Sequence, residues 1–358
     1  MRGNSIWGKI PESQNSLFQI LRFRGFHYFR SVKILVIRFS SIGDCVLTTP
    51  VLRCLNEQVA GAEVHVLVKP AFASVFANNP HISKTWLWQN GVVSALKAQG
   101  FDFIVDLHHN LRSLRVKVAL RCKSSSFPKL NVEKFLLVKF GINRLPNLHV
   151  VDRYFDAVKA LGVANDNKGL DYFPSVADAA IAEKLPASFA NKYTAVVCGA
   201  LQGTKRIPEV KLLNYCNAIR GNIVFIGGPT EAELGARLEA ALGNRSISFC
   251  GETSIGESAV LLQLSNAVLT PDTGMMHIAA AFKKPIAVVW GNTVPAFGMG
   301  PYMPNKSNSV YNAEVDNLKC RPCSKIGFNA CPKKHFNCMN LQQAEPLIQW
   351  INSMNENN

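Results

Sequence analysis

Short, almost continuously apolar segments alternate along the chain with longer amphipathic segments. In the first half the apolar segments lie at residues 32–39, 62–69 and 101–107, and a helical pattern covers residues 46–58. An unbroken apolar run suits a strand that is buried on both faces, as strands are in a parallel sheet. We therefore predict parallel strands joined by right-handed helical crossovers in this half.

The second half repeats the alternation, with helical spacing at residues 231–242 and 255–267. Four further strands are predicted from apolar segments, at residues 192–200, 221–228, 267–272 and 284–292. The stretch at residues 161–180 is polar, contains Gly and Pro and separates the two halves, and we place the boundary at roughly residues 170–188. The predicted fold class is α/β, with two Rossmann-like, doubly wound domains that face each other across a ligand-binding cleft.

Composition and charge refine this picture. The 358 residues are 48% hydrophobic, and the formal net charge of +15 favours an anionic partner such as nucleic acid, a membrane surface or a phosphorylated substrate. Between residues 110 and 144, nine Lys or Arg are accompanied by one acidic residue, Glu133. No apolar stretch is long enough to span a bilayer and no signal peptide is evident, so we expect a cytoplasmic protein.

Three regions are expected along the chain: a basic extension at residues 1–31, a first domain at residues 32–175 and a second at residues 188–350. The extension holds five basic residues and one acidic residue, interleaved with Leu, Ile and Phe. It could form a helix on an anionic membrane, which would attach the protein peripherally to the inner membrane. It could equally pack on the first domain or fray.

The loop "RFSSIGDCVLTTP" follows the first predicted strand but matches neither common phosphate-binding glycine motif. Ser40, Ser41 and Gly43 permit a tight turn, and Asp44 stands where the chain enters a helix. Asp44 could cap that helix. If the two domains face each other, it could instead act as a general base for an acceptor hydroxyl across the cleft.

The second domain offers an anion site at the start of a helix near Thr273, where free backbone N–H groups and the helix dipole favour negative charge. Gly274 allows close approach of a ligand, and His277 lies one turn further on. Asp272 could cap this helix. Two neighbouring strand ends add Thr204, Lys205 and Arg206, and then Gly228 and Glu231. Cations and glycines suit a diphosphate, and a carboxylate suits a ribose.

Four motifs give the chain a family resemblance over most of residues 32–340. They are "KILVIRFSSIGDCVLTTPVLR", "GALQGTKRIPE", "GGPTEAE" and "TPDTGMMHIAAAF". The chain resembles glycosyltransferase family 9, the lipopolysaccharide heptosyltransferase type. The resemblance implies a GT-B fold, an acceptor-binding first half, a nucleotide-sugar-binding second half, and inverting transfer that uses neither a metal ion nor a cofactor.

The resemblance also assigns roles to residues of this sequence. The family's catalytic aspartate falls on Asp44, its diphosphate-contacting lysine on Lys205 and its nucleotide-binding glutamate on Glu231. The phosphate-binding helix start falls on Asp272, Thr273, Gly274, Met275 and His277, with Met275 where the family often has Leu. The donor implied by the family is ADP-heptose, and the implied acceptor is a sugar of the lipopolysaccharide core.

These roles predict a direct displacement at the anomeric carbon. Asp44 would take the proton of the attacking hydroxyl, while Lys205, Thr204 and the first amides of the helix would stabilise the departing nucleoside diphosphate. Five residues of the first domain are candidates for binding the acceptor: Ser41, Gly43, Arg112, Ser113 and Arg115.

The ten cysteines form two groups. Six are scattered through apolar contexts and are expected in the core. The other four, Cys320, Cys323, Cys331 and Cys338, have the spacing C-x2-C-x7-C-x6-C and enclose His335. They could bind zinc or an iron–sulfur cluster. The spacing matches no standard zinc ribbon, so we favour reduced thiols that shape a loop near the donor site.

Three other functions compete with glycosyl transfer. A basic protein that binds nucleic acid or another anion without catalysis fits the charge, although no nucleic-acid-binding motif is present. A dinucleotide-dependent oxidoreductase fits two Rossmann-like halves, but G-x-G-x-x-G is absent. A transferase that binds its donor without turnover is a third alternative, and the intact Asp44 and Lys205 argue against it.

Overall fold

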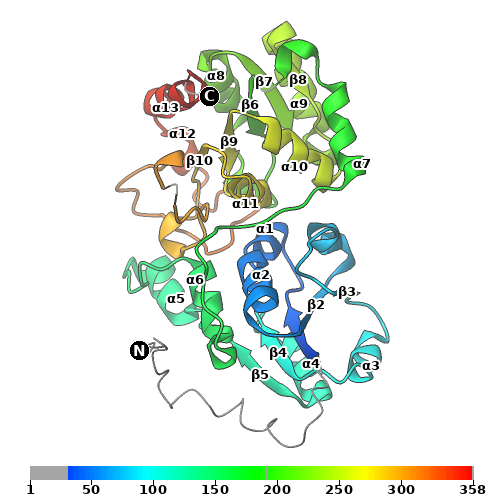
Figure 1. Ribbon diagram of the computed structural model, residues 1–358. Helices are drawn as coiled ribbons and strands as arrows, with labels where there is room; N and C mark the ends of the chain where they lie inside the picture. Colours follow the sequence, from blue (N-terminus) through cyan, green and yellow to red (C-terminus); the bar gives the residue numbers. More distant parts are fainter. Residues whose placement is uncertain (1–30, 191, 306, 357–358) are drawn as a thin grey trace, which may run out of the picture.

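The computed structural model describes residues 31–190, 192–305 and 307–356. The basic extension predicted at residues 1–31 therefore falls almost entirely outside the described residues. Figure 1 shows two α/β units stacked one above the other, the lower drawn in blue to teal and the upper in green to red. Within the described residues, no helix combines the length and the apolar composition needed to cross a membrane.

The first unit contains a parallel sheet with the strand order β3-β2-β1-β4-β5. Its strands are β1 (Val32–Ile37), β2 (Ala62–Val68), β3 (Lys84–Leu87), β4 (Phe103–Asp106) and β5 (Lys123–Ser126). Its α-helices are α1 (Ile42–Val46), α2 (Thr49–Gln58), α3 (Val92–Lys97), α4 (Leu111–Leu120), α5 (Asn131–Phe140) and α6 (Val150–Tyr154). Strand β1 lies between β2 and β4, so Ile34 faces Val64 on one side and Phe103 on the other.

The second unit has the order β11-β10-β9-β6-β7-β8, again with every strand parallel to its neighbours. Its strands are β6 (Tyr193–Val197), β7 (Asn222–Ile226), β8 (Ser246–Ser248), β9 (Ala267–Pro271), β10 (Ile286–Val289) and β11 (Val310–Ala313). Its α-helices are α7 (Val176–Ala179), α8 (Glu209–Ala218), α9 (Ala232–Leu242), α10 (Ile255–Leu264), α11 (Gly274–Ala281), α12 (Asn337–Asn340) and α13 (Ala344–Glu356). This is a doubly wound order. Successive strands are added on one side of β6 as far as β8 and on the other side from β9 onward, so the strand order reverses between β6 and β9.

Each strand predicted from an apolar run is present, within a few residues of its expected ends. The strands that hydrophobic pattern did not reveal are β3, β5, β8 and β11, and these are the four sheet edges. Their sequences are short and mostly polar: KTWL, KSSS, SIS and VYNA. An edge strand pairs on one side only and can face solvent, so it needs no continuous apolar run.

The helix predicted over residues 46–58 is found as α2 (Thr49–Gln58), and a separate short helix, α1 (Ile42–Val46), precedes it. They are separated at Leu47–Thr48, and Pro50 lies in the first turn of α2. Proline lacks the N–H that a continuous helix would need, but it is well tolerated in a first turn. The break matters because α1 becomes a short, independently oriented helix at the end of β1.

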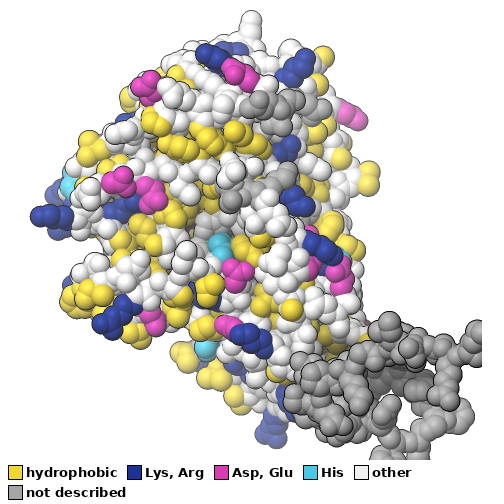
Figure 2. Space-filling model, turned by 60° about the vertical axis from the view of Figure 1, so that its left-hand side comes forward, with side chains coloured by type: hydrophobic (Ala, Val, Ile, Leu, Met, Phe, Trp, Pro, Cys, Tyr) yellow, Lys and Arg dark blue, Asp and Glu magenta, His cyan; other side chains and the backbone are white. Residues whose placement is uncertain are grey.

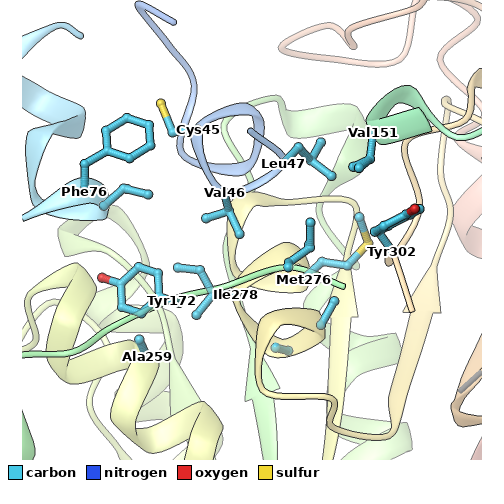
Figure 3. Close-up of a cluster of buried hydrophobic side chains, with 14 of the residues drawn as sticks. Cys45, Val46, Leu47, Phe76, Val151, Tyr172, Ala259, Met276, Ile278 and Tyr302 are labelled. Carbon is cyan, nitrogen blue, oxygen red and sulfur yellow. The ribbon is translucent and has the colours of Figure 1, made fainter. Parts of the chain in front are cut away.

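A buried apolar cluster joins the two units (Figure 3). Val46 and Leu47, at the end of α1, and Met276 and Ile278 of α11 all belong to it and are completely buried. Helices α1 and α11 therefore pack directly on each other across the boundary. Apolar burial of this kind stabilises the contact in proportion to the area removed from water.

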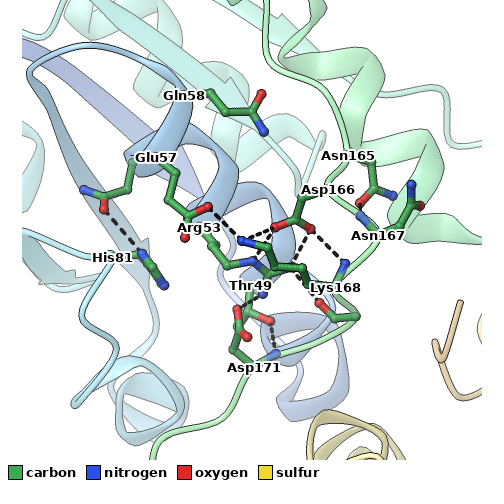
Figure 4. Close-up of polar contacts among 12 residues, drawn as sticks. Thr49, Arg53, Glu57, Gln58, His81, Asn165, Asp166, Asn167, Lys168 and Asp171 are labelled. Carbon is green, nitrogen blue, oxygen red and sulfur yellow. Dashed lines mark hydrogen bonds and ion pairs between the residues drawn. The ribbon is translucent and has the colours of Figure 1, made fainter. Parts of the chain in front are cut away.

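The connection between the units is fastened to α2 by one buried arginine, Arg53 (Figure 4). Its Nε and Nη2 atoms each donate to the carboxylate of Asp166 at 2.8 Å, Nη2 also donates to the carbonyl of Gly169, and Nη1 pairs with Asp171. A bidentate arginine–carboxylate pair fixes geometry as well as charge. The chain is thus held against the first unit as far as Asp171.

Residues beyond this connection already belong to the second unit. Helix α7 packs against α10, and the hydroxyl of Ser254 donates to Asp178 at 3.3 Å. The link between the two sheets is therefore shorter than the boundary predicted at residues 170–188, because α7 and the turn that follows it pack on α10 of the second unit.

Candidate active site

Asp44 lies in the first turn of α1, directly after β1, but it is not the capping residue. Ser41 occupies the N-cap position, and the Asp44 carboxylate accepts hydrogen bonds from Ser41 N at 3.1 Å and Ser41 Oγ at 2.8 Å. This is the acidic half of a capping box. Ser41 and Asp44 therefore share the capping role. It uses one carboxylate oxygen of Asp44, Oδ2, and leaves Oδ1 for a different partner.

That second oxygen pairs with Arg38, a residue that the sequence motifs did not single out. The Arg38 Nη2 atom lies 2.5 Å from Asp44 Oδ1. The rest of the guanidinium donates to the carbonyls of Ser40 at 2.9 Å and Leu107 at 2.6 Å, and to the hydroxyl of Tyr154 at 3.0 Å. A lone arginine at the end of a buried strand was the available signal, since such a charge requires a partner.

The pairing determines the ionisation of Asp44. Burial is the strongest influence and raises the pKa of Asp44, but Arg38 and the two hydrogen bonds from Ser41 lower it, and the net effect is a pKa below the usual value. Asp44 is therefore a carboxylate at neutral pH. A carboxylate that is ionised and still partly exposed can accept a proton from a neighbouring hydroxyl.

The loop of Asp44 touches the predicted phosphate-binding helix start at two glycines. A Cβ atom on Gly43 would lie 2.5 Å from His277 Cδ2, and one on Gly274 would lie 2.8 Å from Ile42 Cβ. Neither position has room for a larger side chain. The close approach places the first turns of α1 and α11, from opposite units, against each other.

His277 lies between Asp44 and the second unit's rim. It is 4% exposed, and its Nδ1 atom has no hydrogen-bond partner among the described residues. Burial, reinforced by Lys205 and opposed by Asp272 and Asp44, lowers the pKa of His277 to about 4. The imidazole is therefore neutral at pH 7 and can offer one N–H donor.

The structure brings together the three loops predicted to form the anion site. They follow β6, β7 and β9, which are neighbours in the order β9-β6-β7. Lys205 Nζ lies 2.7 Å from Asp272 Oδ2, and Thr293 Oγ1 donates to the same oxygen at 2.7 Å. Thr273, not Asp272, is the N-cap residue of α11. Asp272 thus serves as the counter-ion of Lys205, and the half-buried Met275 follows in the first turn of α11.

Thr204 does not offer its hydroxyl to the cleft as predicted. The side chain is 2% exposed, and Oγ1 donates to Asn292 Oδ1 at 2.9 Å and accepts from Phe328 N at 2.8 Å. Its role is to hold the cysteine-rich segment against the loop after β6. A small hydroxyl-bearing side chain next to a lysine suggested a phosphate contact, and tertiary packing gave it another partner.

Glu231 is 5% exposed, and each of its oxygens is occupied. Oε2 accepts from Gly228 N at 3.1 Å, and Oε1 accepts from Thr230 Oγ1 at 2.8 Å and pairs with Arg206 Nη2 at 3.1 Å. Both basic residues of the rim, Lys205 and Arg206, therefore have an internal carboxylate partner.

The three residues of α4 that were predicted to contact the acceptor lie in different environments. Ser113 is completely buried, and its hydroxyl donates to Asp106 at 2.7 Å and accepts from Asn110 N at 2.9 Å. It completes the capping box of α4, whose N-cap residue is Asn110, and does not reach the surface, so we exclude it from the acceptor site. Arg112 lies over the rings of Phe39 and Trp88, with its Cζ atom 5.5 and 5.8 Å from the ring centroids. Arg115 is exposed.

The cysteine-rich segment lies beside the rim. All four of its cysteines are free thiols, and the nearest polar contact is 3.7 Å, between Cys320 Sγ and His335 Nε2. Among the described residues, no three His, Cys, Asp or Glu side chains are arranged so that they could hold a metal ion. Arg321 anchors the segment by donating to the carbonyls of Gly291 at 2.7 Å and Thr293 at 2.8 Å.

Comparison with known proteins places this geometry in context. The model of the family described as glycosyltransferase family 9 (heptosyltransferase) matches residues 91–327. Lipopolysaccharide heptosyltransferase 1 of Campylobacter coli is 22% identical over 293 residues, which cover 73% of this chain and 84% of that protein.

Two solved structures share the fold. The family 9 glycosyltransferase of Veillonella parvula has a TM-score of 0.72 at 19% identity, covering 91% of this chain and 98% of that one. The Escherichia coli heptosyltransferase WaaC with ADP has a TM-score of 0.65 at 19% identity, covering 90% of this chain and all of that one (100%). The expected arrangement of two facing Rossmann-like units, the GT-B fold, is confirmed.

Proposed function

Because this chain belongs to glycosyltransferase family 9, we propose that it transfers heptose from ADP-heptose to a sugar of a lipopolysaccharide core, with inversion and without a metal ion. The observation that carries the proposal is the opposition of Asp44 and Lys205. One unit presents an ionised carboxylate, and the facing unit presents a basic rim with a helix N-terminus, across the contact of Gly43 and Gly274.

The proposed reaction is a single displacement. The acceptor hydroxyl oxygen forms a bond to the anomeric carbon on one face, the bond from that carbon to the diphosphate oxygen breaks on the other face, and Asp44 receives the hydroxyl proton. Arg38 holds the carboxylate ionised and oriented for this step. The low pKa makes Asp44 a weak base, so proton transfer is expected late, when the attacking oxygen has become acidic.

The departing diphosphate needs positive charge near its oxygens. Lys205 and Arg206 supply two side-chain cations, and the first turn of α11 supplies backbone N–H groups. This set supports departure without a divalent cation. The solved relative from E. coli was obtained with ADP, and Glu231, at the end of β7, is the candidate for contacting the nucleoside.

A lipid-linked acceptor would bring the enzyme to the inner face of the cytoplasmic membrane as a peripheral protein. Figure 2 shows hydrophobic side chains interspersed with Lys and Arg on the side of the molecule where α5 lies. On α5, the exposed fractions of Val132, Phe135 and Phe140 are 68%, 58% and 60%. Apolar groups beside basic ones suit an anionic bilayer. Co-sedimentation with phosphatidylglycerol vesicles but not phosphatidylcholine vesicles tests this; equal binding to both would contradict it.

The transfer itself is tested by incubating the protein with ADP-heptose and a deacylated inner-core oligosaccharide, with and without EDTA. We expect heptosylated product with inverted anomeric configuration, formed at the same rate in EDTA. Loss of activity in EDTA would reject the metal-independent mechanism. Calorimetric titration with ADP, GDP and UDP should show selective ADP binding.

A further inference from the structure

The cysteine-rich segment carries positive charge that its own sequence does not balance. Between residues 317 and 344 there are five Lys or Arg and no Asp or Glu. One of the five, Arg321, pairs with Glu314 at 2.7 Å. The other four have exposed side chains and no ion-pair partner among the described residues: Lys319, Lys325, Lys333 and Lys334. The proposed reaction uses none of these lysines.

Exposed apolar side chains lie beside these lysines. Within the segment, Ile326 is 57% exposed and Phe328 is 39% exposed. The loop that follows β6 adds Leu201, which is 85% exposed. The loop and the segment touch, because a Cβ atom on Gly327 would lie 2.7 Å from the Cβ atom of Gln202. Apolar side chains gathered on a surface in this way mark a contact with a partner.

The tip of the segment, residues 325–328, is held in its exposed position from both ends. Before the tip, Ser324 Oγ accepts hydrogen bonds from Ile326 N and Gly327 N, each at 3.0 Å. At its end, Phe328 N donates to Thr204 Oγ1 at 2.8 Å, and the carbonyl of Phe328 accepts from Thr204 N at 2.9 Å. The backbone is fixed by these four bonds, so the fold itself presents Ile326 to solvent.

We infer that the segment and Leu201 together bind an anionic lipid bilayer, with the lysines at the headgroups and the apolar side chains in the interfacial layer. Lysine ammoniums are compact point charges, and a negatively charged surface attracts them without requiring a matched geometry. Three exposed apolar side chains are too few for the core of a stable protein interface. They suit shallow insertion beside basic groups.

This contact would extend the membrane attachment proposed for α5 to the second unit. Figure 1 shows the segment, drawn in orange, on the left side of the view, where α5 also lies. One cavity is lined both by Asn143 and Leu145, just after α5, and by Val310 and Asn312 of β11, which leads into the segment. A bilayer that meets α5 can therefore meet the segment as well, and two contacts on one molecule bind more tightly than either alone.

The first test removes two lysines and uses a control with the same net charge. Lys333→Gln/Lys334→Gln is compared with Lys184→Gln/Lys192→Gln, which removes two exposed lysines of the second unit that lie outside the segment. A lysine near an anionic bilayer changes the partition coefficient about five-fold, so the segment variant should co-sediment with phosphatidylglycerol vesicles roughly 25-fold more weakly. The control should bind within about two-fold of the wild type. Equal losses in both variants would overturn the inference.

The second test concerns the apolar tip. Ile326→Ser should bind phosphatidylglycerol vesicles roughly 5- to 10-fold more weakly, because an apolar side chain no longer enters the interfacial layer. Ile326→Leu keeps the apolar surface and should bind like the wild type. Val176→Ser is the control, since Val176 is 93% exposed on α7, outside the segment. Wild-type binding by Ile326→Ser would reject the insertion.

Hydrogen exchange locates the contact without any substitution. Amides of residues 319–336 should exchange several-fold more slowly with phosphatidylglycerol vesicles present and at an unchanged rate with phosphatidylcholine vesicles. Slower exchange confined to α5 would leave the second unit off the bilayer and overturn the inference. Slower exchange of the segment with native inner-membrane vesicles, but not with phosphatidylglycerol vesicles, would identify a protein partner instead.

Vesicle binding needs neither donor nor acceptor, so this inference and the proposed function can fail separately. It rests on the proposed function only where a lipid-linked acceptor is concerned. Lys333→Gln/Lys334→Gln should lower kcat/KM about 10-fold for acceptor embedded in phosphatidylglycerol vesicles and leave kcat/KM for deacylated acceptor unchanged. Vesicle binding through the segment by a protein that transfers no heptose would uphold the inference and reject the proposed function. Transfer to deacylated acceptor, with vesicle binding unaltered in this variant, would do the reverse.

Discussion

The two sides of the cleft handle positive charge in opposite ways. On the second unit each rim cation already has a carboxylate: Lys205 lies 2.7 Å from Asp272, and Arg206 lies 3.1 Å from Glu231. On the first unit Arg38 is paired with Asp44, whereas Lys134 of α5 and Arg153 of α6 have no ion-pair partner among the described residues. The charges are similar in kind, but one set is neutralised within the protein and the other is not.

Because of this difference, a bound anion must replace an existing ion pair on the second unit but not on the first. A diphosphate that reaches Lys205 competes with Asp272, so part of the new attraction replaces an existing one. An anion that reaches Arg153 replaces nothing, because two of its nitrogen atoms have no partner. Each charge–charge contact should therefore contribute more to binding on the first unit than on the second.

The largest effect is expected from Asp44→Asn, which removes the base and leaves the rim intact. Turnover should fall by about 10²- to 10⁴-fold, because that is the usual contribution of a general base. ADP affinity, measured by calorimetry, should be unchanged. Asp156→Asn, which breaks a surface pair with Lys159 in the same unit, is the matched control and should retain activity. A parallel loss of ADP binding in Asp44→Asn would show that the two sides are not separable.

Lys205→Ala changes the phosphate-binding rim of the second unit and leaves the first unit unaltered. We expect ADP to bind roughly 10- to 100-fold more weakly, since a charge-assisted contact is lost and Asp272 is left unpaired. The acceptor KM should change little. Lys192→Ala, at the opposite end of β6, serves as the control. ADP affinity equal to that of the wild type would remove Lys205 from the phosphate site.

Asp272→Asn removes the carboxylate partner of Lys205, so that this rim cation also lacks a counter-ion. Asparagine can still accept the hydrogen bond from Thr293 but no longer neutralises Lys205. ADP affinity should therefore rise several-fold at low salt, and the gain should shrink as ionic strength increases. Weaker ADP binding would mean that Asp272 contributes to nucleotide binding directly, as the family resemblance implies.

The smallest effect concerns pH. The groups that act on Lys134 are Arg153, Lys325, Lys129 and Asp44, and they and burial together lower its pKa to about 8. Its ammonium is charged below that pH and loses its proton as the pH rises through it. The acceptor KM should therefore increase about two-fold between pH 7 and 8. The increase should be absent in Lys134→Arg, whose guanidinium stays charged, and a pH-independent KM in the wild type would contradict a role of Lys134 in binding the acceptor.

The sequence by itself determined the buried frame and the motif-bearing loops. Strands such as β1 and β6 are buried on both faces, so their apolar runs identified them, and the loops that follow β6, β7 and β9 converge because parallel strands end at one edge. Asp44, Lys205 and Gly274 were found because motif and strand end coincide. The edge strands β3 and β5 escaped notice, because a strand with one solvated side has no distinctive pattern.

Only the tertiary structure decided which polar side chains remain available to bind a ligand. Thr204 and Ser113 were reasonable ligands in sequence, yet each hydroxyl is consumed by a protein partner. Arg38 and Arg153 were unremarkable in sequence, and only the fold pairs Arg38 with Asp44 and leaves two nitrogen atoms of Arg153 without a partner among the described residues. Hydrophobic periodicity is a local property of the chain, whereas the partner of a buried charge is chosen from segments distant in sequence. The partner matters most for a buried charge, because a charge away from water is unfavourable unless the fold or a ligand supplies its counter-ion.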